Sequence, residues 1–80
     1  MLTRQESGTI GLRVRRIEGE DEQTEDIGRS GTIMPPTGYN LAGGTFTVTY
    51  DATDKLPTKV DNCCSFYEFE KIEEGEASHH

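Results

Sequence analysis

The clearest hydrophobic pattern in the chain is an alternation over residues 45–50. Phe46, Val48 and Tyr50 share one parity, and threonines take the other positions. Successive side chains of a strand point to opposite faces, so this pattern predicts a strand with one buried face.

A second alternation lies near the start of the chain. Its apolar members occupy even positions and are separated by glycine and arginine: Ile10, Leu12 and Val14. This is again the period of a strand with one buried face. At Arg16 and Ile17 the apolar parity changes, so either the strand ends there or a bulge turns Ile17 inward.

Between these two segments lie two glycines three residues apart, Gly28 and Gly31. Glycine adopts positive φ without steric cost, so we expect a tight turn here. The β-branched pair at 32–33 then favours a short strand. Prolines at 35–36 end it, because proline has no N–H to donate to a ladder.

A fourth strand is predicted over residues 56–60, where Leu56, Thr58 and Val60 share a parity. Pro57 would then have to lie on a sheet edge.

The last apolar segment fits two structures. Ser65 and Glu68 have the spacing of a capping box, which favours a helical turn, whereas alternation over 66–71 favours a strand. We expect a single helical turn over 65–68 and a short strand over 69–72.

Four or five short strands with frequent turns predict an all-β fold, a small and partly open barrel. Eighty residues suffice for one domain. We expect a flexible arm over 1–7, the barrel over 8–73 with an acidic loop at 18–26, and a disordered acidic tail over 74–80. The tail ends in two histidines that resemble the start of a purification tag.

The order of strands and turns resembles that of SH3-like small β-barrels, including those with KOW-type repeats. Four segments carry the resemblance, which spans about residues 8–73: Gly11-Leu12-Arg13-Val14, Gly28-Arg29-Ser30-Gly31-Thr32-Ile33, Phe46-Thr47-Val48-Thr49-Tyr50-Asp51 and Phe69-Glu70-Lys71-Ile72. It implies about five antiparallel strands with a short helical turn before the last. The proline-rich-peptide site of some such barrels uses a tryptophan, which this chain lacks, so that site is not carried over.

Charge narrows the possible partners. The chain has 15 acidic and 8 basic residues, a net charge of −7. Such a surface repels phosphate backbones and suits a basic partner. Six acids and no base lie within 18–26, and they include our candidate partner-binding residues: Glu20, Asp21, Glu22, Glu25 and Asp26. The run lacks the ligand spacing of an EF-hand, so we expect a solvated loop rather than a metal site.

Four further residues are candidates for partner binding: Arg13, Arg15, Tyr39 and Tyr50. The arginines, with Arg16, form a small basic patch, and nearby aromatic residues could stack on bases. The alternative, which the net charge favours, is that the arginines pair with the acidic loop that follows them.

The two cysteines, Cys63 and Cys64, are adjacent and rarely bridge in that arrangement. We expect one thiol in the core, one outside, and a reducing, cytoplasmic setting. Neither has the neighbouring base that a nucleophile needs. No cofactor motif, phosphate-binding glycine loop, signal peptide or membrane-spanning run is found.

These observations favour a non-enzymatic module that binds another protein, with a homodimer through an exposed threonine-rich strand edge at 45–49 as one form. The alternative is an acidic inhibitor of a nucleic-acid-binding enzyme, of the kind carried by phages and mobile elements. A third hypothesis is a weak RNA- or DNA-binding module that relies on the arginine patch.

Overall fold

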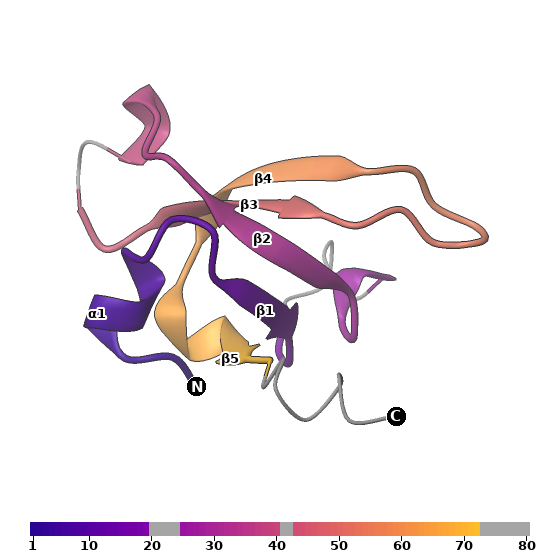
Figure 1. Ribbon diagram of the computed structural model, residues 1–80, viewed down its shortest axis with the longest axis horizontal. Helices are drawn as coiled ribbons and strands as arrows, with labels where there is room; N and C mark the ends of the chain where they lie inside the picture. Colours follow the sequence, from indigo (N-terminus) through magenta and orange to yellow (C-terminus); the bar gives the residue numbers. More distant parts are fainter. Residues whose placement is uncertain (20–24, 41–42, 73–80) are drawn as a thin grey trace.

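The computed structural model describes residues 1–19, 25–40 and 43–72. Its elements are short and are connected by turns (Figure 1): α1 (Arg4–Ser7), β1 (Arg13–Arg16), β2 (Ser30–Met34), η2 (Gly38–Asn40), β3 (Phe46–Tyr50), β4 (Lys59–Cys64), η3 (Phe66–Glu68) and β5 (Phe69–Lys71).

The five strands form one antiparallel sheet in the order β4-β3-β2-β1-β5. Neighbours β1 to β4 follow sequence order, whereas β5 returns to pair with β1. The predicted small all-β fold is therefore confirmed. η2 and η3 are single 3₁₀ turns.

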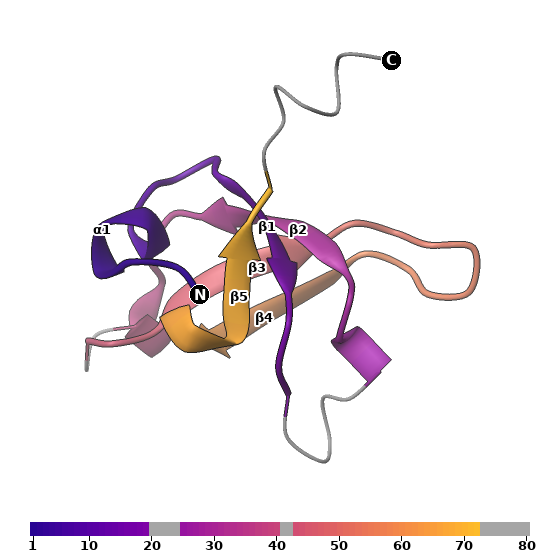
Figure 2. The same ribbon diagram turned by 90° about the horizontal axis from the view of Figure 1, so that it is seen from below.

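The sheet coils around its own core. Phe69 of β5 lies edge-on to Phe46 of β3, with ring centroids 5.5 Å apart, and parallel to the ring of Tyr50 at 6.3 Å. Two strands separate β5 from β3, so a flat sheet would place them roughly 14 Å apart. The strong curvature explains how β5 comes to lie over β3 and β4 in Figure 2.

The core comes from the inner face of this curved sheet and from one N-terminal residue. It contains Leu2, Val14, Ile33, Phe46, Val48, Tyr50, Cys64 and Phe69, with Leu12 and Phe66 packed against it. The predicted burial of alternate residues in β3 is confirmed.

The N-terminal segment is not the loose arm that we expected. Thr3 accepts a hydrogen bond from the N–H of Glu6, and the Glu6 carboxylate accepts one from the N–H of Thr3, which forms a capping box. The spacing Thr-x-x-Glu is a sequence signal for this motif. The short α1 that it starts follows Leu2, whose side chain is 1% exposed.

The predicted start of the first strand was wrong, whereas its end at Arg16 agrees with one of the two predicted alternatives. Ile10 is 59% exposed and precedes β1. At the other end Arg16 takes an inner position, and Ile17 is 38% exposed rather than turned inward. The buried parity therefore continues from Val14 to Arg16, through a charged residue.

The predicted strand at 56–60 was also misplaced. β4 begins at Lys59, and Pro57 precedes it. The expectation for the end of the domain is confirmed. Ser65 and Glu68 form a capping box around η3, and β5 starts directly afterwards. The predicted tail over 74–80 lies outside the described residues.

β3 cannot provide the exposed threonine-rich edge proposed for a homodimer, because it pairs with β2 on one side and β4 on the other. Thr47 is only 2% exposed. Its hydroxyl lies within hydrogen-bonding distance of the side-chain oxygens of Asn40 and Asn62, at 3.0 and 3.2 Å. Among the described residues the terminal strands of the sheet are β4 and β5.

Candidate partner-binding cleft

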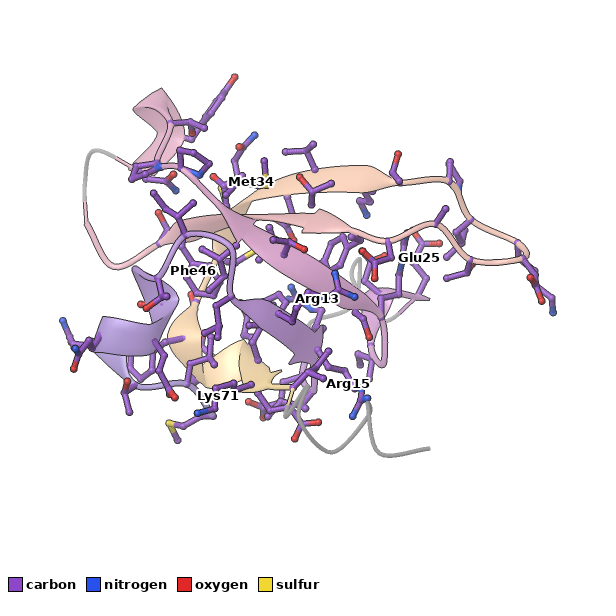
Figure 3. All side chains as sticks on the ribbon, in the orientation of Figure 1. Arg13, Arg15, Glu25, Met34, Phe46 and Lys71 are labelled. Carbon is purple, nitrogen blue, oxygen red and sulfur yellow. The ribbon has the colours of Figure 1, made fainter. Side chains whose placement is uncertain are left out.

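A cleft of about 630 Å³ lies between the turn that precedes β2 and the hairpin that connects β3 to β4. Its walls come from two short stretches of the chain: Glu25, Ile27, Gly28, Arg29 and Ser30 on one side, and Asp51, Ala52, Thr53, Asp54, Lys55 and Leu56 on the other. Figure 3 shows Glu25 beside this hairpin.

Arg29 joins the two walls of the cleft. Its Nη1 donates to Asp26 Oδ1 at 3.1 Å on the turn side. Its Nη2 donates to the backbone oxygens of Asp51 and Pro57, each at 2.8 Å, on the hairpin side. The guanidinium also lies 5.1 Å from the ring centroid of Tyr50. Because one rigid group bonds to both walls, the width of the cleft is fixed before any partner arrives.

Asp26 is the carboxylate that holds this arrangement. It is 1% exposed and also accepts a hydrogen bond from Lys59 Nζ at 2.7 Å. Burial alone would raise the pKa of Asp26, but the bonds from Lys59 and Arg29 outweigh it and lower the pKa. The same bond raises the pKa of Lys59. Asp26 was a candidate for partner binding, but its burial leaves it no surface to offer.

The hairpin wall ends in an ordered turn. The N–H of Thr53 donates to the oxygen of Leu56 at 2.7 Å, and the Thr53 hydroxyl accepts from the N–H groups of Lys55 and Leu56. Asp54 and Lys55 at the tip are both exposed. The turn therefore presents one negative and one positive side chain at the mouth of the cleft.

Beside the cleft, a second cation is buried in the core. Arg16 is 0% exposed, and its Nη2 donates to Glu68 Oε2 at 2.8 Å. Its Nη1 donates to the hydroxyl of Tyr50 at 3.0 Å and to Asp61 Oδ2 at 3.5 Å. The guanidinium lies 5.1 Å from the ring centroid of Phe69. Burial alone would lower the pKa of Arg16, but Tyr50 and the two carboxylates outweigh it, so the guanidinium remains charged.

Tyr50, another candidate, is 0% exposed and belongs to this network. Its hydroxyl donates to Asp61 Oδ2 at 3.1 Å while accepting from Arg16. Burial raises the pKa of the Tyr50 hydroxyl well above its usual value, so it stays protonated as a donor. Tyr50 therefore contributes to the core and not to a contact surface.

The two candidate arginines lie on the outer face of the sheet, and each has an acidic partner (Figure 3). Arg13 donates to both carboxylate oxygens of Asp51 and to the hydroxyl of Thr32. Arg15 donates to Glu70 Oε2 at 3.1 Å. We had expected the partners to lie in the acidic loop, but Asp51 and Glu70 lie outside it. Because each guanidinium has a carboxylate beside it, the patch presents less positive charge to a phosphate backbone.

The remaining candidates are dispersed. Glu25 lines the cleft, whereas Tyr39 is 73% exposed in η2, at the opposite end of the molecule from the β3–β4 hairpin (Figure 1). Glu20, Asp21 and Glu22 lie outside the described residues. The structure thus brings together only part of the predicted set.

The sequence analysis missed most of the cleft, including Ile27, Arg29, Asp54 and Leu56. The turn after Gly28 was recognised, but only as a turn. Nothing local indicates that it faces a hairpin more than twenty residues further along the chain.

The exposure of the thiols was predicted correctly, since Cys63 is exposed and Cys64 is buried.

Comparisons with known proteins give no relative: no family model, no curated protein and no solved structure matches this chain. No described helix is long and apolar enough to cross a membrane. Within the same residues, no group of three or more metal-ligating side chains comes together.

Proposed function

We propose that the chain is a non-enzymatic, SH3-like barrel module of the cytoplasm that binds another, basic protein. The observation that carries the proposal is a cleft with two exposed carboxylates, Glu25 and Asp54, in a chain whose net charge is −7. The chain enters the cleft wall at Glu25 directly from a run of acidic residues that contains no base. Such a surface attracts basic groups and speeds their encounter.

The fold supports the SH3-like part of the proposal. The resemblance implies about five antiparallel strands and a short helical turn before the last strand. The sheet order β4-β3-β2-β1-β5 and the position of η3 agree with both features. The free thiols of Cys63 and Cys64 suit a reducing compartment.

Two features favour a protein partner over nucleic acid. The net charge of −7 opposes approach of a phosphate backbone. The outer arginines Arg13 and Arg15 already have carboxylate partners. A nucleic acid would therefore have to displace Asp51 and Glu70 before it gained a cation.

Affinity capture tests the proposal. Immobilised protein is incubated with nuclease-treated lysate of its source cells at low salt and eluted with a salt gradient. We expect a basic protein that elutes as salt rises and is absent when residues 20–22 carry Gln, Asn and Gln instead of acids. Retention of nuclease-sensitive material, or of the same proteins by both forms, would contradict the proposal. If the captured protein is a nucleic-acid-binding enzyme that the chain inhibits, the module acts as an acidic antagonist.

A further inference from the structure

We infer that the cleft between the turn at 25–30 and the hairpin at 51–56 binds an extended segment of the partner that carries a lysine or arginine. The inference rests on the proposed function and adds the site and the chemistry of the segment. Its basis is a preformed cleft with two exposed carboxylates, Glu25 and Asp54, at its walls and an exposed apolar surface.

The walls of the cleft hold three acidic side chains, Glu25, Asp51 and Asp54, and two basic ones, Arg29 and Lys55, a balance that favours a cation. Of its three carboxylates, Asp51 is held by Arg13, whereas Glu25 and Asp54 are exposed. The nearest cation to Glu25 is Lys59, whose Nζ lies 3.9 Å away and is bound more closely by Asp26. Among the described residues Asp54 has no ion-pair partner. Lys59 already shows that an ammonium group fits beside Glu25.

Apolar surface in the cleft suits the stem of a long basic side chain. Ile27 is 45% exposed, Leu56 is half-buried, and both line the cleft. Lysine and arginine lay their methylene groups along apolar surface while the charged head stays near acids and water. A small ion or a simple amine would leave this surface uncovered.

The occupant is not a second copy of this chain. Two copies would each bring a charge of −7 and would repel one another. The cleft is also preformed, because Arg29 bonds to both walls, so little ordering is needed on binding. A basic segment of a different protein satisfies the charge and the apolar surface of the cleft together.

The test is an NMR titration of the ¹⁵N-labelled protein with acetyl-Lys-Leu-Lys-Leu-Lys-amide, with the corresponding glutamate peptide as control. We expect shifts in the backbone amides of Ile27–Ser30 and Ala52–Leu56, and in the Arg29 side-chain Nε–H signal. The glutamate peptide should cause none. Shifts confined to the region of Tyr39 would overturn the inference and leave the proposed function intact.

Variants separate a local effect from a general effect of charge. E25Q/D54N should lower the affinity for the lysine peptide by about five- to tenfold, as expected for the loss of two exposed ion pairs. E6Q/E70Q removes the same charge from half-buried acids outside the cleft and should change affinity by less than about twofold. Equal weakening by both pairs would mean diffuse attraction and would overturn the inference. The inference would also fail if the lysine peptide does not bind while lysate capture still yields a basic partner.

Discussion

Gly31 is the residue at which the close packing of this sheet is most open to test. Its backbone lies in β2 opposite Tyr50 of β3, in a buried position. A Cβ built there would lie 2.7 Å from the backbone oxygen of Thr49 and 2.7 Å from Cγ1 of Val48. The positive φ that we expected is found at Gly28, with φ 90°, and not at Gly31. Gly31 is needed for space.

The cost of Gly31→Ala follows from these distances. Carbon atoms pack at about 3.5–4.0 Å, so the new methyl group needs Val48 to retreat by roughly an ångström. Overpacking of this kind costs typically about 1–3 kcal/mol. Since the oxygen of Thr49 belongs to the sheet backbone and cannot rotate away, we expect about 3 kcal/mol. The whole domain has only about 4–12 kcal/mol of stability, so melting should fall by roughly 12–24 °C.

Two other glycines provide matched controls. Gly28→Ala has nothing within 4 Å of the new Cβ but a φ of 90°, so we expect a loss of about 1–2 kcal/mol from backbone strain. Gly38→Ala has open space and no positive φ and should change stability by less than about 0.5 kcal/mol. Urea unfolding followed by far-UV circular dichroism measures all three. A Gly31→Ala protein as stable as Gly38→Ala would refute the reasoning.

Three further predictions concern the buried charges and the thiols. Arg16→Met should cost about 3–5 kcal/mol, since it leaves buried carboxylates without their cation, whereas Arg15→Met on the outer face should cost less than about 1 kcal/mol; equal losses in urea unfolding would contradict this. Asp26 has a lowered pKa in the folded state, so its contribution is complete above its ordinary value of 3.8 and is lost as pH falls through the folded pKa; Asp26→Asn should therefore show a flatter fall in stability below about pH 4. Cys63 should be alkylated by iodoacetamide in the native protein, while burial raises the pKa of Cys64 and keeps it unmodified until unfolding; equal rates by mass spectrometry would count against it.

The parts of the fold that could be predicted are those in which local sequence decides the outcome. In β3 the apolar side chains fall on one parity and the threonines on the other, so strand and buried face follow directly. The turn at Ser65 and Glu68 is also local, because its two hydrogen bonds join residues three apart. The same signal at Thr3 and Glu6 was overlooked although it was equally clear.

The predictions that failed concern residues whose partners lie far away in the chain. Arg16 occupies an inner position because Glu68 and Asp61, 52 and 45 residues away, neutralise it there. A pattern based on hydrophobicity reads such an arginine as the end of a buried face. The sequence analysis missed the cleft for the same reason, since Arg29 joins its walls through the backbone oxygens of Asp51 and Pro57. Backbone acceptors carry no residue signature.

The pairing of charges explains where the net charge of this protein acts. Within the part of the chain that the structure describes, six of the eight cations form ion pairs with six different carboxylates: Arg13 with Asp51, Arg15 with Glu70, Arg16 with Glu68, Arg29 with Asp26, Lys71 with Glu6, and Lys59 with Glu25. Arg16 also contacts Asp61, so one cation serves two carboxylates and the pairs that hold the sheet carry one excess negative charge. The surplus is concentrated in the acidic run before the cleft, in Asp54 and in the acids after residue 72. Salt screens exposed charges more than buried ones. The fold should therefore withstand high salt, whereas attraction of a basic partner to the cleft should not.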